Sequence, residues 1–473
     1  MNPSKRSLTH TLAALPPIAP GNPREAIRAA VAANPRHKIV VLDDDPTGTQ
    51  TVHDIPVLTT WAAGTLASEF AGPFPCFYIL TNSRSLAPAA ARAVNLEIAR
   101  NLKSAAGGRE FTIISRSDST LRGYFPLETD ALEDGLGPFD ATILIPYFEA
   151  GKRYTIGDVH YVGEGDTLVP AADTPFARDA SFGYSKSNLR EWVEEKTAGR
   201  VRADNVASIS IEELRDPDGR ATEKVVARLM ELPRGAVCVV NACHSHDMLQ
   251  FAAAALRVES AGRRLLFRTA AEFVMARIGL EPRPLLTAAE LQIPREGGGL
   301  IIAGSYVPKT TQQLERLFAL GRVQRIELSV DAMLAPERRA AEIARVQQEV
   351  HTALSAGHDV AVFTSRVLVT GSSSELSLEI GTHVSSALVS LVRTLAVRPR
   401  YLVAKGGITS SDLATRGLGL KRAMVQGQLL PGVPVWRAGD ETLFPGLCYV
   451  VFPGNVGGPD ALVELHLKLS GGE

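Results

Sequence analysis

Short apolar runs alternate with longer segments of mixed polarity along most of the chain. In the first part of the sequence these runs are rich in β-branched residues, and they lie at 38–43, 76–80, 111–115, 141–146, 207–211, 236–241 and 264–268. Helix-like segments fall between most of them. Alternation of this kind is typical of α/β units arranged around a largely parallel sheet.

The region from about 147 to 187 interrupts this pattern. It is rich in glycine, aspartate, proline and aromatic residues, and its stretch RYTIGDVHYVG alternates polar and apolar positions. Such alternation predicts a hairpin, and long connections of this kind often carry function. We interpret the region as a flap inserted beside a site.

A second interruption, rich in proline, charge and glycine, lies between Gly279 and Gly299. The alternation then resumes, with strands expected at 300–304, 325–330, 358–364, 401–405 and 447–452. We therefore predict an N-terminal domain of residues 1–285 and a C-terminal domain of residues 298–473. The predicted fold class is α/β, and each domain has a largely parallel or mixed sheet flanked by helices.

Polar side chains directly after the strands are candidates for chemistry, because ligands in open α/β sheets bind beyond the carboxyl ends of the strands. Three consecutive carboxylates, Asp43, Asp44 and Asp45, follow the first strand. Like charges this close raise one another's pKa and need a cation, a bound hydroxyl or donor groups nearby. The alternative is a solvated turn that caps the following segment.

Basic and hydroxyl side chains follow the next two strands. Arg84 comes after the second strand, and the third is followed by Arg116, Asp118, Ser119 and Arg122. Arginine forks bind carboxylates in a bidentate manner, while aspartates and hydroxyls suit neighbouring carbinol groups, so the set suits a small polyhydroxy acid. Alternatively, the arginines pair with the three aspartates and steady the loops.

The second domain has glycine where the first has charge. Three of its strands are followed by glycine-containing turns, and the candidate residues there are Ser305, Gly406, Gly407, Ile408, Thr409, Ser410, Gly454, Asn455 and Gly457. Exposed backbone N–H groups in such turns, before a helix, form a cradle for phosphate. The alternative for each glycine is tight packing alone. A fourth stretch, Gly371–Ser374, fits a helix cap better than a phosphate contact.

Composition narrows the range of partners. The 473 residues include 50 basic and 51 acidic side chains, so the chain has no global positive field for nucleic acid or an anionic membrane. Four cysteines at irregular spacing fit buried thiols in a reducing compartment. No apolar stretch approaches about 18 residues. We therefore expect a cytoplasmic protein whose partners are small molecules.

Four motifs resemble the signatures of the four-carbon acid-sugar kinase family, and they are DDPTG at 44–48, SDSTLRG at 117–123, GGITS at 406–410 and PGNVGG at 453–458. The resemblance runs from about Lys38 to the C-terminus. It implies that the N-terminal domain binds a sugar acid and that the C-terminal domain binds ATP, with Mg²⁺ expected. The active site is then expected in the cleft between the domains.

The resemblance also assigns roles. Asp44, Asp45, Arg84 and the 118–122 stretch are similar to substrate-site residues, and Ser305, 406–409 and Gly454 are similar to ATP contacts. We expect Asp44 or Asp45 to orient or deprotonate the hydroxyl group that attacks the γ-phosphoryl group.

Three features depart from the usual family forms, namely Pro46, Thr49 and the Ser115–Ser117 lead-in. The acid therefore stays open: D-threonate, L-threonate and D-erythronate are substrates of relatives of this type, and a divergent acid is an equal alternative. The metal site, the hydroxyl that is phosphorylated and a homodimeric state are open as well.

Two other functions fit parts of the sequence. Asp43, Asp45 and Thr47 formally match the first motif of haloacid-dehalogenase-like phosphatases, in which the first aspartate is phosphorylated. That alternative leaves the glycine turns unexplained. A non-catalytic sensor of sugar acid or nucleotide would bind both ligands without turnover.

Overall fold

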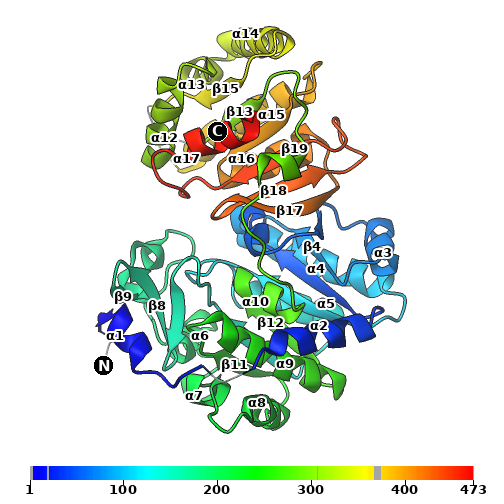
Figure 1. Cartoon of the computed structure of the whole chain (residues 1–473), viewed down its shortest axis with the longest axis vertical. Helices are drawn as coiled ribbons and strands as arrows, with labels where there is room; N and C mark the ends of the chain where they lie inside the picture. The colour runs from blue at the N-terminus through cyan, green and yellow to red at the C-terminus, as the bar shows by residue number, and fades with distance from the viewer. Residues whose placement is uncertain (1–3, 19–20, 306, 367–373, 472–473) are drawn as a thin grey trace. The chain divides into compact units, whose positions relative to one another are not determined.

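The structure is a computed structural model, drawn in Figure 1. It describes residues 4–18, 21–305, 307–366 and 374–471, and of residues 374–379 it describes the backbone alone. The chain forms two compact units. Unit 1 consists of Met1–Thr51 and Thr60–Pro282, and unit 2 consists of Val52–Thr59 and Arg283–Glu473.

Unit 1 contains a parallel sheet in the order β10-β11-β6-β12-β5-β2-β4. The strands are β2 (Lys38–Asp43), β4 (Cys76–Leu80), β5 (Phe111–Arg116), β6 (Ala141–Ile145), β10 (Ala207–Ile209), β11 (Ala236–Val240) and β12 (Leu265–Thr269). β2 and β4 are buried along their whole length. Continuous apolar burial is expected for parallel strands that are covered on both faces.

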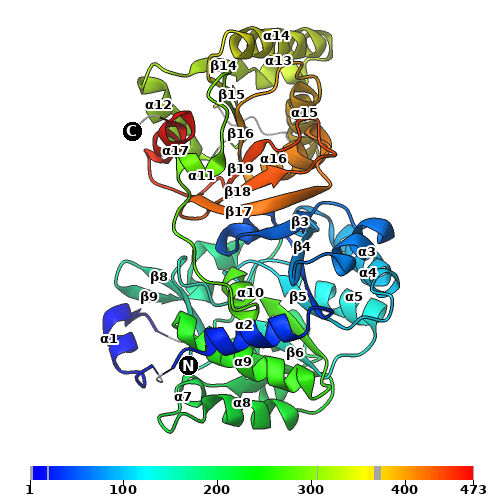
Figure 2. The same ribbon diagram turned by 45° about the vertical axis from the view of Figure 1, so that its right-hand side comes forward.

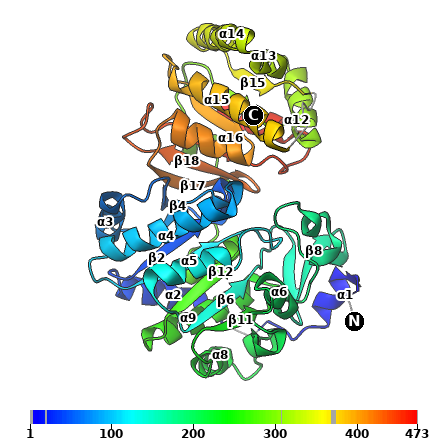
Figure 3. The same cartoon turned by 180° about the vertical axis from the view of Figure 1, so that it is seen from behind.

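Helices cover both faces of this sheet. On one face α2 and α10 pack against α9, and on the other α3 and α5 pack against α4, as Figures 2 and 3 show from two sides. The helices of unit 1 are α1 (Leu8–Ala13), α2 (Pro23–Ala33), α3 (Ala63–Ala71), α4 (Pro88–Ala105), α5 (Leu127–Leu136), α6 (Leu189–Lys196), α7 (Ile211–Leu214), α8 (Ala221–Met230), α9 (Ser245–Ser260) and α10 (Ala271–Arg277).

A small antiparallel sheet lies beside α1, with the order β1-β9-β8-β7. Its strands are β1 (Arg6–Ser7), β7 (Arg153–Ile156), β8 (Val159–Glu164) and β9 (Thr167–Pro170). The hairpin predicted within 147–187 is thus confirmed as β7 and β8. We call residues 147–187 the flap.

Unit 2 contains a mixed sheet in the order β3-β17-β18-β19-β16-β13-β15-β14. The pairs among β3, β17, β18 and β19 are antiparallel, and those from β19 to β14 are parallel. The strands are β3 (Ile55–Leu58), β13 (Leu300–Ala303), β14 (Gln324–Leu328), β15 (Val360–Thr364), β16 (Tyr401–Lys405), β17 (Arg422–Leu430), β18 (Val433–Ala438) and β19 (Cys448–Phe452).

The helices of unit 2 follow the strands closely. They are α11 (Ala288–Leu291), α12 (Pro308–Ala319), α13 (Val330–Leu334), α14 (Pro336–Ser355), α15 (Ser374–Arg393), α16 (Gly407–Asp412), a π-helical turn (Leu413–Gly417) and α17 (Ala461–Ser470). Among the described residues, no helix combines the length and the apolar content that a membrane crossing needs.

The α/β class, with a parallel sheet in unit 1 and a mixed sheet in unit 2, each flanked by helices, confirms the predicted fold. The antiparallel part of unit 2 was not predicted. β17 and β18 lie where no strand was expected, and β3 lies far from them in sequence yet pairs with β17. The expected strand at 325–330 ends earlier, because Val330 begins α13 after Ser329 caps that helix.

Candidate functional site

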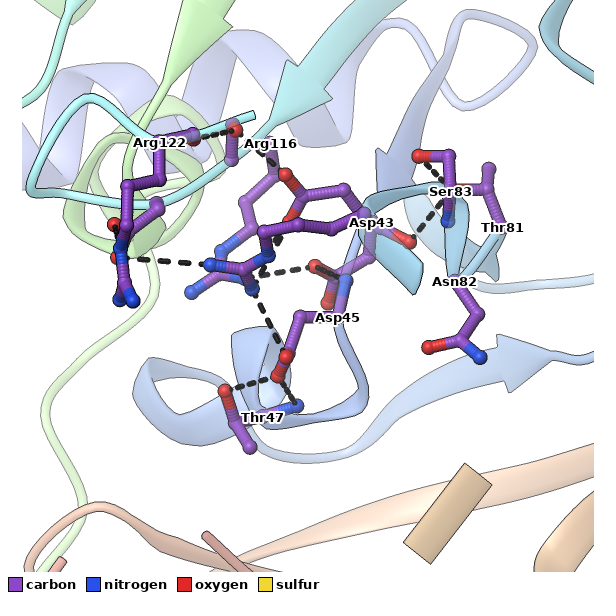
Figure 4. Close-up of polar contacts among 12 residues, drawn as sticks. Asp43, Asp45, Thr47, Thr81, Asn82, Ser83, Arg116 and Arg122 are labelled. Carbon is purple, nitrogen blue, oxygen red and sulfur yellow. Dashed lines mark hydrogen bonds and ion pairs between the residues drawn. The ribbon is translucent and has the colours of Figure 1, made fainter. Parts of the chain in front are cut away.

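The three consecutive aspartates lie at the carboxyl end of β2, and they differ in exposure. The side chains of Asp43 and Asp44 are 1% and 2% exposed, whereas 25% of the Asp45 side chain is exposed. Asp45 Oδ1 accepts hydrogen bonds from the backbone N–H and the hydroxyl of Thr47. Figure 4 shows Asp45 and Thr47 on the same turn. Asp45 is therefore the carboxylate of this run that is open to a ligand.

Two of the predicted arginines are paired with these carboxylates. Arg84, in the turn after β4, lies 3.0 Å from Asp45 Oδ2, 3.3 Å from Asp44 Oδ1 and 3.7 Å from Asp118 Oδ1. Arg116, the last residue of β5, lies 2.9 Å from Asp43 Oδ1. The sequence left open whether the arginines bind a ligand or pair with the aspartates. In the structure, Arg84 and Arg116 pair with the aspartates.

The pairing separates the pKa values of adjacent carboxyl groups. Burial raises the pKa of Asp43 to about 7, although Arg116 opposes the shift, and the charges of Asp44 and Asp45 add to it. Burial alone would raise the pKa of Asp45 too, but Arg84 and the Thr47 donors hold it below its ordinary value. Asp45 therefore stays ionised at neutral pH, while Asp43 is close to half-protonated.

Asp44 is hydrogen-bonded to a buried network of side chains that the sequence did not predict. Ser117 Oγ donates to Asp44 Oδ2 at 2.6 Å, and Arg268 on β12 donates to Ser117 Oγ at 2.8 Å. Arg268 also pairs with Glu128 on α5, which accepts a hydrogen bond from Ser83. Burial raises the pKa of Glu128, with Arg268 opposing the shift. The network links the ends of β2, β4, β5 and β12.

In the DDPTG and SDSTLRG motifs, the positions of Gly48 and Gly123 require glycine because neighbouring side-chain atoms approach them closely. A Cβ atom on Gly48 would lie 2.1 Å from Asp43 Oδ2, and one on Gly123 would lie 2.6 Å from Ser117 Oγ. Gly123 also has a φ of +121°, which L side chains rarely adopt. Both glycines thus let the loops close over the carboxylates.

The flap holds the Asp118–Arg122 loop. His160 donates from Nε2 to the Ser119 carbonyl at 2.8 Å, and burial lowers the pKa of His160 to about 4, so it is neutral. The Tyr184 hydroxyl donates to the Thr120 carbonyl at 2.8 Å. Arg122 donates to Asp118 Oδ2 at 2.7 Å. The flap therefore fixes the backbone of this loop.

In unit 2, the glycine turns after β13, β16 and β19 come together. A Cβ atom on Gly304 would lie 2.4 Å from Thr409 Oγ1, and one on Gly454 would lie 3.2 Å from Ser305 Oγ. Gly406 has a φ of +118°, and its Cβ would lie 3.2 Å from Thr409 Oγ1. These turns pack so closely that side chains would fill the space between them.

Of the other residues predicted in unit 2, some lie at the start of α16 or in the turn after β19, and others pack internally. Gly407 and Ile408 open α16, and 60% of Ile408 is exposed; the Asn455 carbonyl accepts a hydrogen bond from Lys309. Ser410 is fully buried, and its hydroxyl donates to the Ala404 carbonyl. A Cβ on Gly457 would lie 2.5 Å from that of Ala461 on α17. Ser410 and Gly457 therefore serve local packing.

Lys405 lies beneath these turns and was not among the predicted site residues. Its ammonium group is fully buried, donates to the Pro453 carbonyl at 2.9 Å and lies 3.8 Å from the centre of the Phe452 ring. Burial, together with the nearby charge of Lys309, lowers the pKa of Lys405 to about 7. An anion beside it would restore its charge. The predicted cap at Gly371–Ser374 lies outside the residues whose side chains are described.

The fit to a divalent cation is limited. Across the described ranges, no three His, Cys, Asp or Glu side chains are grouped as metal ligands would be. In unit 1, Arg84 and Arg116 are ion-paired with aspartates. In unit 2, the turns offer the hydroxyls of Ser305 and Thr409. Mg²⁺ commonly binds through substrate phosphates with few protein ligands.

Two family models match this chain. A sugar-binding N-terminal domain matches residues 39–277, and a nucleotide-binding C-terminal domain matches residues 300–462. The first model covers the charged loops of unit 1, and the second covers the glycine turns of unit 2.

Individual relatives are distant. A protein of Heliobacterium modesticaldum named D-erythronate kinase is 24% identical over 324 residues, which cover 66% of this chain and 67% of that protein. A crystal structure of a DUF1537 protein from Haemophilus influenzae has a TM-score of 0.64 at 18% identity, covering 91% of this chain and all of that one. A Salmonella typhimurium LT2 structure, provisionally described as a tRNA synthase, has a TM-score of 0.65 at 18% identity and covers 90% and 98%. The two structures share the fold.

Proposed function

Because the chain belongs to the four-carbon acid-sugar kinase family, we propose that it transfers the γ-phosphoryl group of ATP to a hydroxyl group of a small sugar acid. The D-erythronate kinase relative makes D-erythronate the first acid to test. The observation that carries the proposal is the ionised, partly exposed Asp45 at the carboxyl edge of unit 1. It lies within a set of arginines and aspartates that suits a polyhydroxy acid.

Asp45 is the best candidate to orient the attacking hydroxyl. Asp43 and Asp44 are buried, and each already has a partner in Arg116 or Ser117. Asp45 keeps an exposed carboxylate whose ionisation is maintained by Arg84. In phosphoryl transfer, positioning and charge stabilisation supply most of the catalysis, so a fixed carboxylate is sufficient for this role.

Unit 2 would bind the nucleotide at the turns after β13, β16 and β19. Backbone N–H groups near Gly406 and Gly454, with the hydroxyls of Ser305 and Thr409, would face the phosphates. Lys405 would gain charge beside them. Mg²⁺ would arrive with ATP and supply further charge neutralisation on the phosphate oxygens.

The phosphatase alternative conflicts with the geometry of Asp43. A phosphorylated nucleophile must reach its substrate, yet the Asp43 side chain is 1% exposed and bonded to Arg116. Gly48 packs directly against the same carboxylate.

The test is ADP release from Mg-ATP by the purified chain with D-erythronate, D-threonate, L-threonate and longer aldonic acids. ADP formation that depends on one acid is the expected result. Phosphate release from phosphorylated sugar acids without ATP would support the phosphatase, and binding of both ligands with no turnover would support the sensor.

A further inference from the structure

The arginines around the loops that follow β2, β4 and β5 differ in how closely carboxylates surround them. Arg84 has three carboxylates within 3.7 Å, and Arg116 has Asp43 at 2.9 Å. Arg268 is paired with the buried Glu128. These three guanidinium groups hold the site together, and each has at least one carboxylate partner.

Arg122 and Arg153 are arranged differently. Their guanidinium carbons lie 5.2 Å and 5.4 Å from the centre of the same aromatic ring, that of Phe176. Arg122 comes from the loop after β5, whereas Arg153 and Phe176 both belong to the flap. An aromatic face holds a guanidinium plane while its N–H edges stay available.

Arg153 has spare donors. One terminal nitrogen donates to the Gly151 carbonyl, and its buried Nε has no hydrogen-bond partner. In the described part of the chain, no carboxylate lies within ion-pair distance of it. Asp118 and Arg122 are nevertheless close enough to affect its pKa, which burial lowers. Arg153 is thus a desolvated cation beside the site without a partner of opposite charge.

Charge balance gives this cation a purpose. Without it, the loops carry the carboxylates Asp44, Asp45 and Asp118, and Asp43 in part because its pKa is raised, against the three cations Arg84, Arg116 and Arg122. Asp179, at 3.9 Å from Arg122, adds a further negative charge. An anionic substrate would meet a net negative site, which disfavours its binding.

We propose that Arg153, together with Arg122, binds the carboxylate of the sugar acid and so selects acids over neutral polyols. The inference rests on the proposed function and assigns the flap a direct part in substrate choice. With the carboxylate at this pair, the hydroxyl groups of the acid extend along Asp118 toward Asp45. Phe176 acts as a positioning residue that holds both guanidinium groups.

The test uses the full chain and isothermal titration with D-erythronate, D-threonate and L-threonate, and with erythritol as the neutral analogue. A charged hydrogen bond contributes about 1.5–3 kcal/mol, so Arg153→Gln should weaken binding of the preferred acid roughly 10- to 100-fold. The weaker erythritol binding should stay unchanged. Arg153→Lys should recover part of the loss, and kcat should fall less than KM rises.

Lys186→Gln is the matched control, because it removes one positive charge from the flap at a side chain that is 44% exposed. Its acid affinity should equal that of the wild type. Equal acid binding by Arg153→Gln and the wild type would overturn the inference and leave the proposed function standing. Failure of the wild type to bind any acid of the panel would overturn both. Loss of acid and erythritol binding together, with a lowered melting temperature, would make Arg153 structural and also overturn it.

Discussion

The polar edges of the two units differ in where their polar groups come from. In unit 1, side chains from four strand ends form a charged network in which Arg84, Arg116 and Arg268 are each matched to carboxylates. In unit 2, backbone turns that only glycine permits lie together over one buried lysine. A rigid charge pattern suits selection of one small acid, whereas backbone donors suit phosphate groups shared by all nucleotides.

The largest effect should come from Asp45→Asn in unit 1. This change keeps the size of the side chain but removes the charge that orients the hydroxyl, so kcat should fall by about 10²- to 10⁴-fold. ATP binding, measured by titration, should be unchanged because its proposed site lies in unit 2. Asp134→Asn, an exposed surface position, is the control and should keep full activity. Equal loss of ATP binding would contradict the separation of roles.

The second test concerns the buried support of unit 1. Glu128→Gln leaves the Arg268 charge without its partner, and breaking a buried ion pair costs about 3–5 kcal/mol in the free energy of unfolding. Urea denaturation measures this loss. Glu223→Gln breaks an exposed pair with Arg257 and should change stability by less than about 1 kcal/mol. Similar values for both variants would show that the network is not essential to the unit.

The contrast between the units also explains what the sequence could reveal. Buried parallel strands are continuous apolar runs, so their positions were predictable from local pattern alone. β3, with Pro56 in its four residues, and β17, with Gly427 among glutamines, carry weak strand signals. Their pairing depends on contacts across more than 350 residues of sequence, which no local pattern records.

The same limit applies to the site. Motif residues after strand ends were found because topology places them at one edge. Arg268 and Glu128 were missed because each lies within a strand or a helix, and because the two residues, which pair with each other, are 140 residues apart in the sequence. Ser410 and Gly457 belong to the motifs of the predicted phosphate turns, yet their own contacts are internal. Spacing identifies a loop, and burial decides which side chains of the loop are open.

A third test addresses the backbone of unit 2. Gly406→Ala forces an L side chain into a φ of +118° and places its Cβ 3.3 Å from that of Ser305. Strain of this kind costs about 1–3 kcal/mol and is relieved when the turn moves, so restoring the turn for ATP should weaken its binding roughly 5- to 150-fold, while acid binding stays constant. Gly381→Ala, in α15 with open space around it, is the control and should bind ATP normally. Unchanged ATP affinity in Gly406→Ala would remove this turn from the phosphate site.

The smallest expected effect is the uptake of a proton by unit 2 when the nucleotide binds. With a pKa of about 7, Lys405 is mostly neutral at pH 8, and a phosphate placed beside it would raise that pKa. Nucleotide binding at pH 8 should therefore take up close to one proton, and the uptake should shrink toward zero below pH 6, where Lys405 is already charged. Titrations in buffers with different ionisation enthalpies measure it.

Lys405→Met should abolish this uptake, whereas Lys468→Met, which changes a partly buried lysine that also donates to a carbonyl, should leave it intact. Uptake that persists in Lys405→Met would assign the proton to another group and separate Lys405 from the phosphates. Loss of the uptake would show that unit 2 gains one positive charge, on Lys405, when the nucleotide binds at pH 8. Unit 1 would then differ in kind, since three of its arginines, Arg84, Arg116 and Arg268, are already paired with carboxylates before the acid arrives.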